Sequence, residues 1–169
     1  MKIFANHAHV FRRDQRADGT VSALLEVMDK TGIEKCVCFA PFYEWGLDYN
    51  PNLWMAEELK AHPELTGFGV VDIHGQDLAG QVRQIRELGL KGIKLHPAFQ
   101  KFAIDGPEAF QVYAAAQEAG LFLSFHTGVH WHRIKDYQPL LFDEVAWHFP
   151  DLKFSMEHVG GYCFFNEAL

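Results

Sequence analysis

The sequence predicts an α/β protein of the (β/α)8 barrel type, with about six strand–helix units present. Short apolar runs alternate with segments of helical periodicity, and successive runs begin about thirty residues apart, as right-handed crossovers require. Histidines follow the ends of four runs, where barrels gather their functional side chains. The first strand-to-helix loop, His7 to Arg13, lacks the glycine pattern of a dinucleotide-binding sheet, so a barrel is favoured over a doubly wound sheet.

The expected elements follow one another regularly. Strands are expected over residues 2–9, 35–40, 65–73, 92–98, 121–126 and 152–158, where apolar residues cluster. Helices are expected over residues 21–31, 52–62, 78–88, 107–119 and 137–149, and a further helix is expected to begin at Asn166. Glycines stand where three of these helices should end: Gly32, Gly89 and Gly120.

We expect residues 1–169 to form a single domain that is only part of a barrel. A barrel of this type takes about 250 residues, whereas the chain has 169 and yields six units, so strands seven and eight are expected to be missing. Six strands alone would leave two unpaired edges and an unfilled interior. The sequence therefore predicts a truncated barrel that something else completes.

Composition excludes several classes of function. A formal net charge of −7 argues against a nucleic-acid surface, which needs clustered Lys and Arg. The sequence contains no run of about 18 uncharged apolar residues, so no membrane span is expected. Met1 leads almost directly into the first strand, so no secretory signal is expected either. Three cysteines, Cys36, Cys38 and Cys163, cannot all pair. We expect a cytoplasmic chain with a small-molecule substrate, and a homo-oligomer is left open.

The first strand ends in two histidines separated by one residue, His7 and His9. Side chains at i and i+2 leave the same face of a strand with Cα atoms ~6.7 Å apart, so both rings can reach one metal ion at ~2.1 Å. Three further strand-like runs end at His96, His126 and His158. A single such histidine is more often satisfied by backbone groups in a core or loop, but four strand ends with histidines favour a metal site.

Four motifs follow the strands in order: His7-x-His9, Gly92-Ile93-Lys94-Leu95-His96-Pro97, His126-Thr127-Gly128 and His158-Val159-Gly160-Gly161. Together, and over the whole chain, they resemble the amidohydrolase-related branch, amidohydrolase family 2, of the amidohydrolase superfamily. The resemblance implies a metal-dependent barrel enzyme that hydrolyses C–N or C–O bonds or, in one sub-branch, removes a carboxyl group without oxidation. It also implies zinc as the commonest metal, with manganese or iron as the other options.

The resemblance implies His7, His9 and His126 as metal ligands, and His158 as the ligand of a second metal or the residue that steers the attacking water. Some members carry a carboxylated lysine at the position of Lys94, for which a substrate-anchoring ammonium and a buried ion pair are the alternatives. The aspartate that the family places at the end of strand eight has no counterpart here. The chain alone is therefore expected to bind metal poorly.

Residues that bind the substrate are expected near the same strand ends. His96 shares a face of its strand with Lys94 and suits either a contact with the substrate or a structural bond to a loop. Trp45, in the aromatic segment 41–45, could form an apolar wall, although such segments also cover barrel mouths or form dimer contacts. In the segment 130–133, Arg133 is best suited to an anionic group, because a guanidinium binds a carboxylate bidentately.

The leading hypothesis is a hydrolase in which a divalent ion activates water and polarises the scissile carbonyl of a small, carboxylate-bearing substrate. His158 and Lys94 are the candidate catalytic residues. Decarboxylation is the nearest alternative, because the same ion can hold a carboxylate and a phenolate of the substrate. A hypothesis of another class is a non-catalytic partial barrel, an interaction module that depends on a partner chain.

Overall fold

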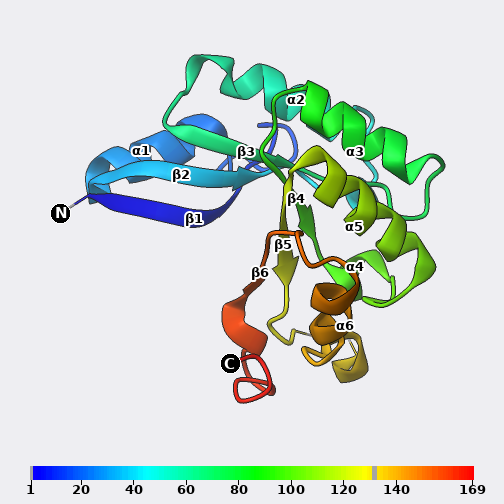
Figure 1. Ribbon diagram of the computed structural model, residues 1–169. Helices are drawn as coiled ribbons and strands as arrows, with labels where there is room; N and C mark the ends of the chain where they lie inside the picture. Colours follow the sequence, from blue (N-terminus) through cyan, green and yellow to red (C-terminus); the bar gives the residue numbers. More distant parts are fainter. Residues whose placement is uncertain (1, 131–132) are drawn as a thin grey trace.

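In the computed structural model, which describes residues 2–130 and 133–169, six parallel strands form one sheet in the order β1-β2-β3-β4-β5-β6 (Figure 1). Each strand pairs with the next one along the chain, as in a barrel wall. The strands are β1 (Ile3–His9), β2 (Ile33–Phe39), β3 (Leu65–Gly69), β4 (Gly92–Leu95), β5 (Phe122–His126) and β6 (Phe154–Glu157).

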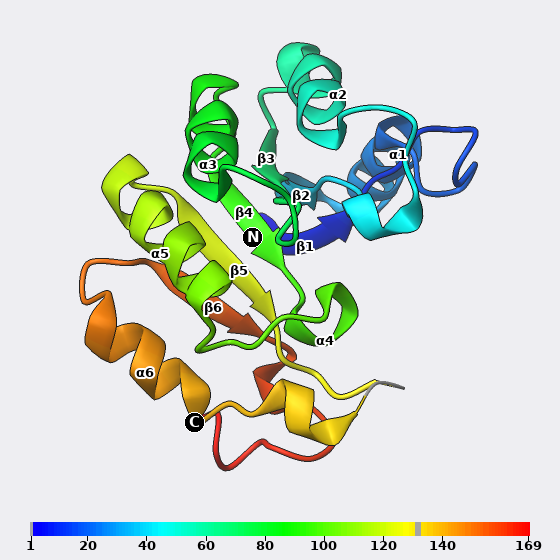
Figure 2. The same ribbon diagram turned by 90° about the vertical axis from the view of Figure 1, so that its right-hand side faces the viewer.

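Helices connect the strands and lie along the outer face of the sheet. They are α1 (Val21–Thr31), α2 (Pro51–Glu58), α3 (Leu78–Glu87), the short α4 (Pro97–Gln100), α5 (Pro107–Ala119) and α6 (Leu141–His148). Figure 2 shows α3, α5 and α6 along the outer side of β4, β5 and β6. The expected glycine caps are confirmed: Gly32, Gly89 and Gly120 have φ of 72°, 82° and 65°. None of the helices in the described segments is long and apolar enough to cross a membrane.

Alternate residues of each strand point to opposite faces of the sheet. On β5, Leu123 and Phe125 are fully buried in the main apolar core beneath the helices. Phe122, which precedes Leu123, and Ser124, which lies between Leu123 and Phe125, line a cavity on the inner face instead. The outer face therefore holds the core, and the inner face is the side on which functional groups can gather.

The sheet curls until the ends of its two edge strands meet. In a flat sheet, β1 and β6 would lie about 24 Å apart, because neighbouring strands are about 4.8 Å apart. Nδ1 of His7 on β1 nevertheless lies 3.2 Å from Oε2 of Glu157 on β6. The predicted partial barrel is thus confirmed, and side chains bridge its open side.

Two strands end earlier than the sequence predicts. β3 stops at Gly69 instead of residue 73, because the Asn52 side chain hydrogen-bonds to both the N–H and the C=O of Val70, each at 2.8 Å. β4 stops at Leu95 instead of residue 98, because Pro97 is the first residue of α4. The predicted boundaries were wrong where side chains or a proline replaced the hydrogen bonds between strands.

Two helical predictions also need correction. The helix expected at residues 137–149 begins at Leu141, because Pro139 holds Gln138 out of the helical region and a separate 3-10 helix, η3 (Ile134–Tyr137), precedes it. The helix expected to begin at Asn166 is not formed, and residues 165–168 make turns.

Candidate functional site

The four histidines predicted as metal-site residues lie in one row at the carboxyl ends of the strands. The ring centroids of His9 and His7 are 5.2 Å apart, those of His7 and His158 5.0 Å, and those of His158 and His126 4.6 Å. The row runs from β1, across the open side of the curl, to β6 and β5. The tertiary structure therefore brings together residues that the sequence separates by up to 151 positions.

A bulge in β1 turns both His7 and His9 away from the outer core. Between Ala5 and Ala8, β1 contains one residue more than the facing part of β2. Ala5 and Ala8 both pack against the core on the outer face, although a regular strand would place residues three apart on opposite faces. The bulge thus resets the alternation and leaves the two histidines on the inner face.

His9 carries the clearest sign that the cluster suits a metal ion. Burial, followed by the charge of Lys94, lowers the pKa of His9 to about 3, so the ring is neutral. Its Nδ1 is buried and has no hydrogen-bond partner in the described part of the chain. A neutral imidazole with an unpartnered nitrogen is the form that binds a divalent ion. His9 therefore offers a donor nitrogen of the kind that a divalent metal ion binds.

The motif His126-Thr127-Gly128 builds the turn that holds β5 against β6. Nε2 of His126 donates to the carbonyl of Gly128 at 2.7 Å, which leaves Nδ1 as the nitrogen with a lone pair. Burial lowers the pKa of His126 to about 3, although this hydrogen bond opposes the shift. The Thr127 hydroxyl donates to the Glu157 carbonyl at 2.6 Å. A Cβ on Gly128 would come within 2.9 Å of the His158 Cβ, so glycine makes room for that ring.

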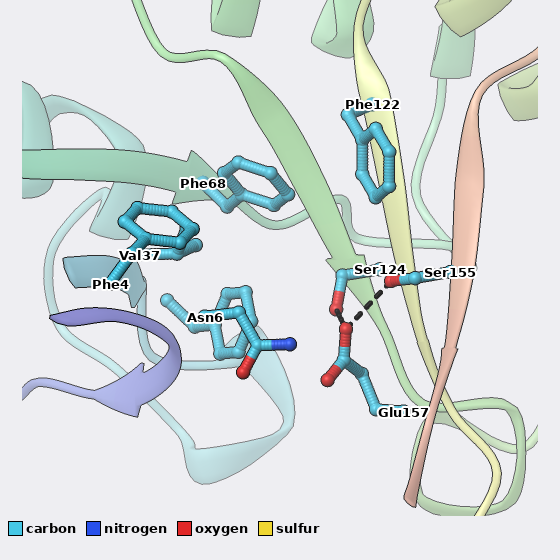
Figure 3. Close-up of a pocket in the computed structure, with 9 residues that line it drawn as sticks. Phe4, Asn6, Val37, Phe68, Phe122, Ser124, Ser155 and Glu157 are labelled. Carbon is cyan, nitrogen blue, oxygen red and sulfur yellow. Dashed lines mark hydrogen bonds between the residues drawn. The ribbon is translucent and has the colours of Figure 1, made fainter. Parts of the chain in front are cut away.

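Glu157 lies inside the site but is not among the residues that the sequence predicts for it. Its Oε2 accepts a hydrogen bond from His7, and its Oε1 accepts bonds from Ser124 at 3.1 Å and Ser155 at 2.7 Å (Figure 3). Burial raises the pKa of Glu157, but the bonds from His7 and Ser155 and the charge of Lys94 together lower it to about 2. The available signal was the alternation on β6, which places Glu157 on the same face as Ser155.

Lys94 is fully buried beneath the cluster. Its Nζ lies 3.4 Å from the Ser124 hydroxyl and 4.7 Å from the centre of the Phe39 ring. Burial lowers the pKa of Lys94 to about 7, while the charge of Glu157 acts in the opposite direction. Lys94 thus reaches the Glu157 carboxylate through the Ser124 hydroxyl, and which of its three predicted roles applies stays a prediction.

A second group of histidines adjoins the row. One ring nitrogen from each of His96, His126 and His130 lies within 4.8 Å of the others, close enough to bind one ion after small movements. The rings of His96 and His126 are stacked with centroids 3.9 Å apart. Nδ1 of His96 also accepts a hydrogen bond from the Phe99 amide at 3.2 Å and so caps the first turn of α4; the predicted bond was to a loop, and the predicted contact with a substrate stays a prediction.

The predicted aromatic wall is connected to the histidine row through Phe42. Trp45, in the 3-10 helix η1 (Tyr43–Trp45), is 43% exposed, and its ring centroid is 5.4 Å from that of Phe42 and 5.8 Å from that of Phe99. The Phe42 ring is in turn 6.2 Å from the His9 ring. The Phe42 ring therefore lies between Trp45 and His9, one of the candidate metal ligands.

Arg133 follows the histidine group in the chain and is exposed at the start of η3. Residues 131–132, which the sequence places in the same segment, lie outside the described residues. The guanidinium of Arg133 is accessible to an anionic group that arrives from solvent.

A cavity of about 260 Å³ lies on the inner face of the sheet below the histidine row. Aromatic rings including Phe39, Phe68 and Phe122 line one part of it, and Ser124 and Glu157 line another (Figure 3). The site thus combines an apolar inner surface with a polar end at the carboxyl termini of the strands.

Comparisons with known proteins agree with this architecture. The model of the family described as amidohydrolase matches residues 7–163. No curated protein matches the sequence. An uncharacterized TIM-barrel protein from Bordetella bronchiseptica superposes with a TM-score of 0.81 at 20% identity, over 99% of this chain and 70% of that protein.

Two other similar structures have functional descriptions. A mutant 5-carboxyvanillate decarboxylase from Novosphingobium aromaticivorans, with bound manganese and 3-methoxy-4-hydroxy-5-nitrobenzoic acid, has a TM-score of 0.71 at 16% identity over 94% of this chain and 66% of its own. A probable 2-pyrone-4,6-dicarboxylic acid hydrolase from Acinetobacter baumannii, with citric acid bound, has a TM-score of 0.60 at 18% identity over 86% and 54%. Such likeness shows the fold, and the chain spans 54–70% of the lengths of these three proteins.

Proposed function

This chain belongs to the amidohydrolase family, and on that premise we propose that it is a metal-dependent hydrolase. Its reaction would be the attack of an activated water on a C–N or C–O bond of a small, carboxylate-bearing substrate. The observation that carries the proposal is His9, a neutral imidazole with a buried, unpartnered nitrogen in a row of histidines at the strand ends. Family membership supplies the expectation of a divalent metal.

We assign the metal to His7, His9 and His126, with zinc as the proposed ion. When bound, a divalent ion would polarise the scissile carbonyl and lower the pKa of water. His158, exposed beside both His7 and His126, would orient the attacking water through its ring nitrogen. Lys94 would keep the floor of the site in place through the Ser124 hydroxyl, which also bonds to the Glu157 carboxylate. Manganese is the alternative ion, because one structurally similar protein holds it.

The substrate would lie between the histidine row and the surrounding loops. His96 and Trp45 would contact its body, and the exposed guanidinium of Arg133 would bind its carboxylate. Organic acids are bound in two of the similar structures, which supports this class of substrate. We also propose that the chain acts as one partial-barrel domain in the cytoplasm, where Cys36 and Cys38 would stay reduced.

Decarboxylation is the second candidate function, because a decarboxylase is among the structures that share the fold. The two reactions differ in their products. Incubation of zinc- and manganese-loaded protein with aromatic carboxylic acids and with cyclic esters or amides would release carbon dioxide in the first case and a new acid in the second.

A metal-content measurement tests the ligand assignment. Because the strand-eight aspartate is missing, zinc is added in excess; under that condition we expect about one zinc ion for each wild-type chain by elemental analysis, and loss of most of it in His9→Ala, because one of three ligands is removed. His130→Ala is the matched control, since His130 is exposed and lies in the neighbouring group of histidines.

The opposite pattern of zinc loss in these two variants would assign the metal site to other histidines. If His130→Ala lost the zinc and His9→Ala retained it, His96, His126 and His130 would hold the ion instead. Wild-type protein that bound no stoichiometric metal, even with added zinc, would favour a non-catalytic interaction module over an enzyme.

A further inference from the structure

The Glu157 carboxylate lies where the two edge strands of the curled sheet meet. It comes from the last residue of β6, and its Oε2 is 3.2 Å from Nδ1 of His7 on β1, 150 positions away. We propose that Glu157 is the positioning residue for His7: it fixes the tautomer and the orientation of that ring so that Nε2 keeps the lone pair for the metal. The inference rests on the proposed function, because it gives His7 a metal to bind.

The chemistry of the contact decides which nitrogen carries the proton. A carboxylate only accepts hydrogen bonds, so Nδ1 of His7 is the donor, and in the neutral ring Nε2 then carries the lone pair. Histidines that bind metals commonly donate their other N–H to a carboxylate in this way, which orients the ring and raises its basicity. Glu157 thus stands in the relation to His7 that a supporting carboxylate has to a ligand.

Glu157 is itself held in place. Its Oε1 accepts hydrogen bonds from Ser124 on β5 and Ser155 on β6, so the carboxylate cannot rotate freely toward His7 or away from it (Figure 3). The side chain of Glu157 is 10% exposed and that of His7 24% exposed. Water therefore competes little for the contact, and the bond is stronger than it would be at the surface.

The position of Glu157 also couples two parts of the site. It directly precedes His158, and the Thr127 hydroxyl holds the Glu157 carbonyl at 2.6 Å, so one fixed turn positions both residues. Through Glu157, the ring of His7 on one edge strand is oriented relative to His158 on the other. In the described sheet β1 and β6 share no backbone pairing. The orientation of His7 relative to His158 therefore depends on contacts between side chains.

A different role would be that of a counter-charge for the buried Lys94. Two substitutions separate the roles. Glu157→Gln removes the charge but keeps a carbonyl oxygen that can accept from His7, whereas Glu157→Leu removes every acceptor. Positioning predicts a graded effect, with the glutamine variant closer to wild type. A counter-charge role predicts equal effects, since both variants lose the charge. Ser155→Ala is an intermediate variant, because it removes one of the two bonds to Oε1 and leaves Ser124, the Glu157 charge and the bond to His7 in place.

The experiment has two measurements. In the metal-free wild-type protein, NMR of isotope-labelled histidine should show His7 protonated at Nδ1, and in Glu157→Leu a mixture of tautomers. Zinc affinity, measured by competition with a chromophoric chelator, should fall about 10- to 100-fold in Glu157→Leu and less in Glu157→Gln. Ser155→Ala, which keeps the Ser124 bond and the Oε2 acceptor, should keep the His7 tautomer and lose less zinc affinity than Glu157→Leu.

The outcomes separate this inference from the proposed function. Protonation of His7 at Nε2 in the wild type, or a folded Glu157→Leu variant with wild-type zinc affinity, would overturn the inference alone. If the wild type bound no zinc, the proposed function would fail, while the tautomer of His7 would still decide whether Glu157 orients it. If circular dichroism shows that Glu157→Leu does not fold, two other results decide whether Glu157 orients His7. These are the His7 tautomer in the wild type and the zinc affinity of Glu157→Gln.

Discussion

The outer face of the curved sheet packs against helices, whereas its inner face opens on a cavity of about 260 Å³. On β5, the outward Phe125 is fully buried, while the inward Phe122 is only half-buried, and Phe4 on the inner face of β1 is 59% exposed. The outer face therefore carries most of the buried apolar area and most of the stability. The inner face is left to carry groups whose roles are chemical.

The polar groups of the inner face are stabilised by one another. Lys94, Ser124 and Glu157 form a connected set in which each has a partner from a neighbouring strand. On the outer face a buried charge of this kind would interrupt the apolar packing. The comparison shows that one strand can contribute to stability and to chemistry at once, because its alternate residues meet different surroundings.

The strongest test of the comparison uses two phenylalanines on one strand. We expect Phe125→Ala to lower the free energy of unfolding by about 3–5 kcal/mol, because it leaves a void in a close-packed core. Phe122→Ala should cost clearly less, since that side chain already borders a cavity. Urea denaturation monitored by circular dichroism measures both. Equal losses would show that the inner face contributes as much stability as the outer face.

A second test examines the tight inner packing between β3 and β5. A Cβ on Gly92 would lie 2.4 Å from the Phe122 carbonyl and 2.5 Å from the Phe68 ring. We therefore expect Gly92→Ala to lower the free energy of unfolding by about 1–3 kcal/mol through overpacking.

Gly89→Ala separates crowding from backbone strain, because a Cβ there would meet nothing within 4 Å although φ is 82°. It should cost roughly 1 kcal/mol from its left-handed backbone alone. A Gly92→Ala variant as stable as the wild type would mean that the inner face can relax around the added methyl group.

The smallest expected effect concerns Tyr113, whose hydroxyl donates to the Ile104 carbonyl at 2.9 Å in the outer layer. Burial, and after it the charge of Asp105, raises the pKa of Tyr113. The folded state therefore disfavours the tyrosinate, and this group's contribution to stability is complete below about pH 10, the unfolded pKa, and declines as the pH rises above it.

Tyr113→Phe should cost about 1 kcal/mol at neutral pH, through the lost hydrogen bond. Its stability should then fall less steeply than that of the wild type between pH 10 and 11, as measured by urea denaturation at each pH. Identical slopes for the two proteins would show that this part of the outer layer admits water.

Much of the fold could be predicted because it depends on patterns among residues that are close in the sequence. The apolar periodicity gave six strands and five helices in their correct order, and glycines marked the helix ends at Gly32 and Gly120. Some errors came from nearby prolines, at Pro97 and Pro139, and one came from a distant side chain. Asn52 ended β3 by hydrogen-bonding to Val70, and no local pattern in the predicted strand announces that contact.

The sequence by itself determined that histidines end four strands of a parallel sheet, because strand alternation and element order depend on residues a few positions apart. Only the tertiary structure decided how those histidines are oriented. The bulge that turns His7 inward, the stacking of His96 on His126 and the bond from His7 to Glu157 depend on the curl of the whole sheet. That curl results from the sum of the twists between all six strands, and contacts across 150 positions form only when it is complete.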